Sequence, residues 1–280
     1  NVKIITITET PDNWAPKKWA LNSAVKESNT DIILQTDADC VPNKNWVTTA
    51  VQYFSKPSVG FISGPAPLTI DNNTLLNSLF KLDSLSQDAF SAGGFSRGLV
   101  FSCTGRNMGF LKQAFEDVGG YSNISNFISG DDDLLLQKIA NHPIYKAKFM
   151  FSKNAMVESP PPDSIMQFIN QRLRFSSKGF SYYSIQASSA LKIVLPFLYI
   201  TNLVILLSLS KFIETNQFLW IFPWLIKLLT DIVFTYMFYH IIEQKWSLLT
   251  TILLSVLHPI YIVFFGIAGP LSSFDWKKDD

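Results

Sequence analysis

This sequence has few cysteines and almost no excess of either charge. Its 280 residues include two cysteines, Cys40 and Cys103, and its 23 basic and 22 acidic side chains leave a formal net charge of +1. Two cysteines cannot build the disulfide framework of a small secreted domain, so we predict a reducing compartment. No stripe or run of basic residues is present, which argues against a nucleic-acid surface.

Residues 31–42 combine a short apolar run with two acids. The run Ile-Ile-Leu at 32–34 is typical of a strand buried on both faces, and Pro42 stops it from continuing inside a sheet. Asp37 and Asp39 follow this run, and ligands of an open parallel sheet bind beyond the carboxyl ends of its strands. Two acids so close together repel each other unless a cation or another partner relieves the repulsion. Their carboxylate oxygens are ligands that suit Mg²⁺ or Mn²⁺, and these ions in turn bind a diphosphate. A solvated turn is the alternative, because aspartate is common in turns.

Strand-like and helix-like segments alternate in the first part of the chain. Strands are expected at 2–8, 31–39, 59–63, 99–103 and 144–151, and helices at 17–27, 46–54, 74–90 and 113–118. The β-α-β-α-β alternation at its start predicts an α/β fold with a parallel sheet and helices on both faces.

Two further clusters carry groups that suit chemistry. Three acids at 131–133 follow Gly130 and precede an apolar run, which indicates a helix N-terminus where the helix dipole stabilises carboxylates. Capping explains one or two of these acids, and the third adjacent charge favours another task. The second cluster, Gln-Arg-Leu-Arg-Phe at 171–175, lies on an amphipathic stretch at 165–183; a surface helix with snorkelling arginines is its alternative explanation.

The C-terminal third is dominated by long apolar segments. Residues 193–210, 218–242 and 248–268 each approach the length that crosses a bilayer, and a buried soluble helical bundle is the alternative. Lys227 and Asp231 lie four residues apart in the second segment and are expected to pair on one helical face. We therefore expect a catalytic domain at 1–160, an amphipathic interfacial segment at 161–190 and a transmembrane region of two to three helices at 191–280.

Taken together, these segments resemble the family 2 inverting glycosyltransferases of GT-A fold, especially the membrane-integrated branch that includes cellulose and hyaluronan synthases. The matching segments occur in the family's order: 17–22, similar to its Gly-Lys-x-x-Ala-Leu-Asn helix with Pro16 in place of glycine; 36–40, its Asp-x-Asp; 105–108 and 115–121, its acceptor-side loop and helix; 130–132, its Glu-Asp or Gly-Asp-Asp; and 171–175, its Gln-x-x-Arg-Trp with Phe175 in place of tryptophan. The family's first strand, with its Pro-x-x-Asn-Glu turn, and its Asp-Asp-Gly-Ser segment are missing. We therefore expect the chain to be truncated at its N-terminus.

The resemblance implies metal-assisted, inverting transfer of a sugar from a nucleotide sugar, expected to be a UDP-sugar, to a glycan or lipid-linked acceptor. It also assigns roles to individual residues. Asp132 would be the base, with Asp131 orienting it or binding the acceptor. Asp39 would bind Mg²⁺ or Mn²⁺ at the donor, with Asp37 at the metal, behind its ligands or beside the ribose. Gln171, Arg174 and Arg172 would bind the diphosphate, and Lys17 or Lys18 would add a positive charge there. Gly105, Asn107 and Phe175 would lie on the acceptor side. The transferred group would be a hexosyl or N-acetylhexosaminyl unit.

The same resemblance implies an integral protein of the plasma or inner membrane, with its catalytic domain in the cytoplasm and a place in polysaccharide biosynthesis. Its partners would be the nucleotide sugar, the acceptor and membrane lipids, without nucleic acid. Two other classes compete with this interpretation. The first is a catalytically inactive scaffold or binding subunit, which the retained acids and arginines argue against. The second is a transporter, which is disfavoured because a large soluble part accompanies only three apolar segments.

Overall fold

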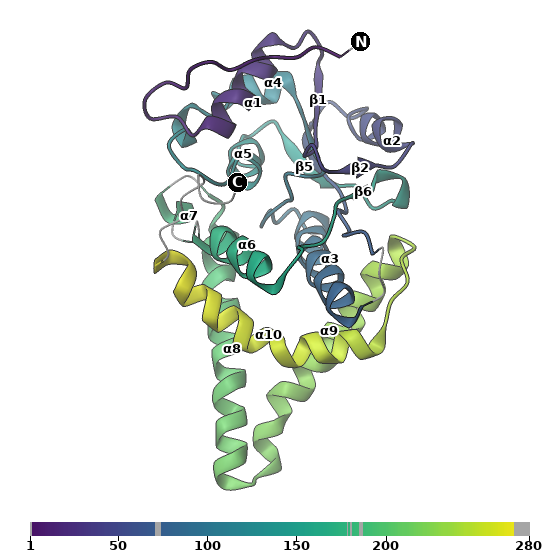
Figure 1. Ribbon diagram of the computed structural model, residues 1–280, viewed down its shortest axis with the longest axis vertical. Helices are drawn as coiled ribbons and strands as arrows, with labels where there is room; N and C mark the ends of the chain where they lie inside the picture. Colours follow the sequence, from purple (N-terminus) through teal and green to yellow (C-terminus); the bar gives the residue numbers. More distant parts are fainter. Residues whose placement is uncertain (1, 71–73, 178, 180, 185–186, 272–280) are drawn as a thin grey trace. The chain divides into compact units, whose positions relative to one another are not determined.

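The computed structural model describes residues 2–70, 74–177, 179, 181–184 and 187–271 (Figure 1). The chain divides into two compact units. The first unit comprises Asn1–Ala66, Ser91–Val157 and Gln186–Ser188, and the second comprises Pro67–Phe90, Glu158–Ile185 and Ser189–Asp280.

A four-stranded sheet forms the centre of the first unit. Its strands lie in the order β1 (Ile32–Gln35), β4 (Met108–Leu111), β3 (Val59–Ser63) and β5 (Lys146–Phe149). Because β4 is antiparallel to β1 and β3, and β3 is parallel to β5, three of these strands run in the same direction. The expected α/β class is thus confirmed, but the sheet is mixed, because two of its three strand pairings, both made by β4, are antiparallel. A second, two-stranded sheet pairs β2 (Val41–Pro42) with β6 (Val157–Glu158).

Strand β3 is buried along its whole length because both faces of the sheet are covered. Successive side chains of a strand point to opposite faces. Ile62 belongs to a cluster with Ala50 of helix α2 (Trp46–Tyr53), while Phe61 stacks on Phe110 with ring centroids 6.5 Å apart. Phe110 in turn stacks on Phe115. The apolar residues predicted at 59–63 therefore serve two layers of core, as a strand buried on both faces requires.

The other helices of the first unit are short. They are α1 (Pro16–Glu27), α4 (Lys112–Asp117) and α5 (Asp133–Ala140), with 3₁₀ turns η1 (Ser122–Ile124) and η2 (Lys153–Ala155). Proline fits the first turn of α1, because the first N–H groups of a helix have no partner inside it.

Two expected strands are absent from the described residues. The segments 2–8 and 99–103 have no strand structure. In the first of them Val2 and Ile4 are almost fully exposed, so an alternating pattern there finds no packed partner. The sequence reading also missed β4, which lies immediately after a turn and contains Gly109. A Cβ at that glycine would lie 2.6 Å from Leu34 Cδ2 and 3.0 Å from the Ile33 carbonyl oxygen, so a larger residue would require the neighbouring strand or the Leu34 side chain to shift.

The second unit is helical. It contains most of α3 (Leu75–Ser96), together with α6 (Ile165–Ser177), α7 (Ser181–Ser184), α8 (Ser189–Thr215), the 3₁₀ turn η3 (Phe218–Ile221), α9 (Phe222–Ile241) and α10 (Leu248–Leu271). Figure 1 shows α10 running across α8 and α9 instead of alongside them, and α6 packs on α10. The amphipathic stretch predicted at 165–183 is thus two helices, α6 and α7.

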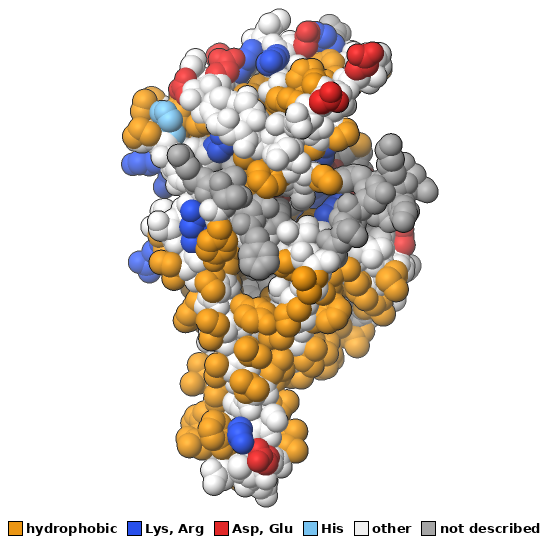
Figure 2. Space-filling model, turned by 90° about the vertical axis from the view of Figure 1, so that its left-hand side faces the viewer, with side chains coloured by type: hydrophobic (Ala, Val, Ile, Leu, Met, Phe, Trp, Pro, Cys, Tyr) orange, Lys and Arg blue, Asp and Glu red, His pale blue; other side chains and the backbone are white. Residues whose placement is uncertain are grey.

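Three helices of the second unit are long and apolar enough to cross a membrane: Ser189–Thr215, Phe218–Ile241 and Leu248–Leu271. They contain 27, 24 and 24 residues, against the roughly 20 that a bilayer core requires. Hydrophobic side chains predominate on the face of these helices that Figure 2 shows. Burial inside the protein is low for all three, which is the opposite of what a soluble helical bundle requires. This part of the chain is therefore suited to lipid.

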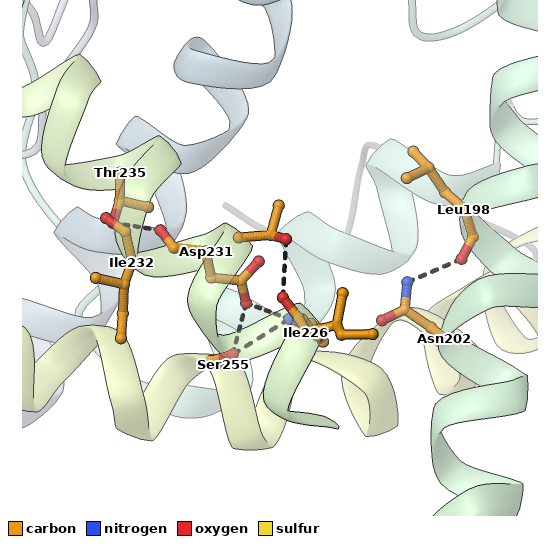
Figure 3. Close-up of polar contacts among 9 residues, drawn as sticks. Leu198, Asn202, Ile226, Asp231, Ile232, Thr235 and Ser255 are labelled. Atoms are coloured by element: carbon orange, nitrogen blue, oxygen red, sulfur yellow. Dashed lines mark hydrogen bonds and ion pairs between the residues drawn. The ribbon is translucent and has the colours of Figure 1, made fainter. Parts of the chain in front are cut away.

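Several polar side chains of these helices have partners within the second unit (Figure 3). Lys227 and Asp231 pair along α9 as expected, and the Ser255 hydroxyl of α10 donates to Asp231 Oδ2 over 2.6 Å. Asn202 Nδ2 donates to the Leu198 carbonyl one turn earlier in α8, over 2.8 Å. Such internal pairing is what charged and polar groups need at membrane depth.

Candidate active site

Lys17, at the start of α1, joins the two acidic motifs of the first unit. Its Nζ lies 3.0 Å from Asp131 Oδ2 and 3.5 Å from Asp37 Oδ1. Burial by itself would lower the pKa of Lys17, but the carboxylates of Asp131 and Asp37 outweigh it and raise the pKa above its ordinary value. The side chain therefore stays charged at neutral pH, and it keeps 38% of its surface exposed.

Asp37 and Asp39 lie in the turn that follows β1. The turn is closed by a hydrogen bond from the Cys40 N–H to the Asp37 carbonyl over 3.2 Å. Asp39 is exposed, and its Oδ1 accepts a long contact of 3.4 Å from Cys40 Sγ. The turn thus presents one carboxylate to solvent and engages the other with Lys17.

Asp132 begins helix α5 and binds two backbone N–H groups. Its Oδ1 accepts from the Asp133 N–H over 2.8 Å, so Asp132 is the N-cap of α5 among the three acids for which the sequence predicted capping of one or two. Its Oδ2 accepts from the Gly105 N–H over 3.0 Å. A Cβ at Gly105 would lie 3.3 Å from that same oxygen, which is tighter than nearly all real contacts. Gly105 therefore lets the 104–107 turn approach the acid pair closely.

Asn107, two residues further on, is fully buried and its amide is fully used. Its Oδ1 accepts from Trp46 Nε1 over 2.9 Å, and its Nδ2 donates to the carbonyls of Pro65 and Ala155 over 2.8 and 2.7 Å. These bonds tie the turn after Gly105 to α2 and to two loops. The Asn107 side chain therefore fixes the position of the turn, whereas the N–H group of Gly105 contacts Asp132.

Lys18 has a different role from its neighbour Lys17. Its side chain is fully buried, and its Nζ donates to the carbonyls of Phe127 and Ser129, the latter over 2.8 Å. These carbonyls belong to the loop that leads into Gly130, whose φ of +84° is a conformation that favours glycine. Lys18 thereby holds the loop that delivers Asp131 and Asp132.

Replacing Lys18 with methionine removes the charge from this loop but retains the length of the side chain. We expect the free energy of unfolding to fall by about 1.5–3 kcal/mol, the usual contribution of hydrogen bonds to a charged group. The thermal midpoint of the full-length protein should fall by several degrees. Lys26→Met, on the exposed side of the same helix, is the matched control and should change little. Equal midpoints for the two variants would contradict the role of Lys18.

The Gln-x-x-Arg segment belongs to α6 in the second unit. Gln171 and Arg174 line a groove of about 470 Å³, together with Asp163, Ser164, Met166, Gln167 and Asn170. Arg174 Cζ lies 5.4 Å from the centroid of the Phe175 ring, and Phe175 is 40% exposed. Arg172 is instead buried and forms an ion pair with Asp83 of α3. The two arginines of the segment thus point to different surroundings.

The residues that the sequence assigned to a metal fit a particular kind of site. In the described part of the chain, no group of three or more His, Cys, Asp and Glu side chains is placed to enclose an ion. Asp37 and Asp39 supply carboxylate oxygens, which are hard donors, and Asp39 is open to solvent. Mg²⁺ is commonly held by one or two carboxylates plus substrate phosphates and water. The pair fits an ion that arrives with a diphosphate, and it does not fit a closed structural site.

Comparison with known proteins identifies the family of the chain. No curated protein matches the chain. A family model described as "Glycosyl transferase family group 2" matches residues 32–270, which include both acidic motifs, the 105–108 turn, the Gln-x-x-Arg segment and the three apolar helices. Lys17 lies just outside the matched range. Because the match covers most of the sequence, the chain belongs to glycosyl transferase family group 2.

Proposed function

We propose that this glycosyltransferase moves a hexosyl or N-acetylhexosaminyl unit from a nucleotide sugar, most simply a UDP-sugar, to a hydroxyl of a glycan or lipid-linked acceptor. Transfer inverts the anomeric carbon and takes place at a membrane, with the catalytic domain in the cytoplasm, where nucleotide sugars are made. The observation that carries the proposal is Lys17, whose single ammonium group contacts both Asp37 and Asp131. It joins the acids proposed for the donor to those proposed for the acceptor.

On the donor side, the leaving group is a diphosphate, which gains negative charge as the glycosidic bond breaks. Asp39 and Asp37 would hold Mg²⁺ or Mn²⁺, which supplies Lewis-acid neutralisation of that charge when bound. Lys17 adds a fixed positive charge beside Asp37. Arg174 and Gln171 bind the diphosphate oxygens, because the planar guanidinium donates two parallel hydrogen bonds to such groups.

On the acceptor side, the reacting hydroxyl must lose its proton as its oxygen bonds to the anomeric carbon. Asp132 takes that proton, while the bond from carbon to the diphosphate oxygen breaks on the opposite face. Gly105 and Asp133 hold the carboxylate of Asp132 in place through their N–H groups. Asp131, which forms an ion pair with Lys17, orients Asp132 or binds the acceptor. Phe175 offers an exposed aromatic face to a sugar ring, whereas Asn107 acts structurally by fixing the turn that carries Gly105.

The proposal is tested by incubating the full-length protein, in lipid nanodiscs with Mn²⁺, with a panel of nucleotide sugars. Release of free nucleoside diphosphate and formation of a glycosylated product are measured in parallel. We expect one UDP-sugar to be consumed with product of inverted anomeric configuration, as determined by NMR. If no nucleotide sugar is consumed while UDP still binds, the inactive scaffold is the better interpretation. If UDP does not bind, the proposed donor is wrong.

A further inference from the structure

The buried ion pair between Arg172 and Asp83 has no part in the mechanism described above. Asp83 lies in α3 and Arg172 in α6, and their side chains are only 6% and 9% exposed. Asp83 Oδ2 also accepts from Gln87 Nε2, one turn further along α3, over 3.1 Å. Burial raises the pKa of Asp83, an effect that Arg172 and Gln87 oppose. The carboxylate thus depends on these two partners for its charge.

Arg172 is surrounded by aromatic rings as well as by its ion-pair partner. Its Cζ lies 4.9 Å from the ring centroid of Phe168 and 5.4 Å from that of Phe175. Phe168 stacks on Phe80 of α3, with centroids 4.7 Å apart. A guanidinium enclosed by rings and a carboxylate is in place to fix the orientation of its helix. It offers little room to a diphosphate.

Helix α6 presents two different faces. Residues 167, 170, 171 and 174 follow helical spacing and line the groove that contains Gln171 and Arg174. At about 100° per residue, Phe168 and Arg172 form a separate face, centred roughly 130° around the helix from the groove face. If α6 rotates about its axis, the Arg172 face and the groove face therefore move together. The position of Gln171 and Arg174 depends on what holds the side that carries Arg172.

Helix α10 holds α6 from a second direction. A Cβ at Gly269 would lie 2.3 Å from Ser176 Oγ, so the two helices approach closely at that point. Within α6, Ser176 Oγ donates to the Arg172 carbonyl one turn earlier over 2.5 Å. The ring centroid of Tyr261, in α10, lies 6.1 Å from that of Phe168. The close approach at Gly269 and the Tyr261–Phe168 contact hold α6 against α10, while the ion pair with Asp83 and the stacking of Phe168 on Phe80 hold it against α3.

We propose that Asp83 and Arg172 are positioning residues, whose ion pair sets the rotation of α6 and thereby places Gln171 and Arg174 for the nucleotide diphosphate. This inference rests on the proposed function. It assigns a task to Asp83, which no sequence motif indicated, and it changes the task of Arg172 from donor ligand to support. Neither residue touches the substrate; both act through the groove face of α6.

Three variants of the full-length protein test the proposal: Asp83→Asn, Arg172→Met, and the apolar pair Asp83→Leu with Arg172→Met. We expect each single change to lower turnover by about 10–100-fold, because a displacement of about 1 Å in a site can cost 10²-fold. We expect the apolar pair to recover at least tenfold over Arg172→Met, since well-packed apolar residues often replace a buried ion pair without loss. Lys211→Met, in the exposed pair with Glu214, is the control for loss of a lysine charge.

A ligand role for Arg172 gives the opposite pattern. Asp83→Asn would then leave the guanidinium free for the diphosphate, so UDP affinity and turnover would be unchanged or higher, and the apolar pair would be as impaired as Arg172→Met. Either result overturns the proposal, as does wild-type turnover in all three variants. If the single variants do not fold, the apolar pair decides: a folded, active pair supports the proposal, and a folded, inactive pair or one that does not fold overturns it. Absence of UDP binding and of sugar transfer in the wild type would instead overturn the proposed function.

Discussion

Asp39→Asn is expected to lower sugar transfer by at least about 10³-fold while leaving the fold intact. A bound metal ion stabilises the charge on the leaving diphosphate by several kilocalories per mole. Because about 1.4 kcal/mol corresponds to a tenfold change in rate, loss of the ion should lower the rate of transfer by roughly a thousandfold. Asparagine keeps a carbonyl oxygen but loses the negative charge that attracts the ion. Because Asp39 is exposed and its described contact to Cys40 is long, the substitution should cost the fold little.

The measurement combines turnover of a nucleotide sugar with binding of Mn²⁺ in the presence and absence of UDP. Asp39→Asn should lose the Mn²⁺ binding that depends on UDP, because Asp37 and Asp39 alone do not enclose an ion. Asp31→Asn is a matched control, since Asp31 is an exposed acid immediately before the same strand. Full activity of Asp39→Asn, or undiminished turnover of the wild type in excess EDTA, would show that the metal has no role.

The sequence predicted the elements whose signal is local. Strand β3 was predicted at its observed bounds, because its apolar run is bounded by Gly64 and Pro65 and is buried on both faces. Strand β4 was missed, since the narrow space at Gly109 is set by Ile33 and Leu34 on the neighbouring strand. A glycine in a short run lowers the local preference for a strand, and only the packed sheet shows why it is there.

For the candidate site, too, the sequence predicted what depends on neighbouring residues and missed what depends on contacts between distant ones. Spacing identified both acidic motifs, and the resemblance placed Lys17 near the donor. Neither showed that Lys17 contacts Asp131, which lies more than a hundred residues away in sequence. Adjacent lysines gave no sign that Lys18 is buried, because the direction of a side chain depends on how its helix packs. Asp83 gave no signal at all, as a single acid in a helix usually faces solvent.

Substitutions of Asp132 and Arg174 are expected to impair sugar transfer in different ways, because Asp132 acts on the acceptor and Arg174 on the leaving group. Asp132→Asn keeps the size and the helix-capping ability of the side chain, but it cannot take a proton. Turnover should therefore fall by roughly 10²–10⁴-fold, the usual contribution of a positioned base, with UDP affinity nearly unchanged. Of the two N–H groups that the carboxylate binds, from Gly105 and Asp133, one loses its charged acceptor, at a cost of about 1.5–3 kcal/mol in folding stability.

Arg174→Ala removes a charged contact to the diphosphate, so UDP binding should weaken by about 1.5–3 kcal/mol in addition to the loss of turnover. Arg174→Lys should restore only part of that affinity, because an ammonium group lacks the planar pair of donors. Calorimetric titration with UDP beside a turnover assay separates the two variants. If Asp132→Asn loses UDP binding while Arg174→Ala binds UDP normally, the two roles are reversed. The acid at the start of α5 would then belong to the donor site, and the groove on α6 would belong to the acceptor.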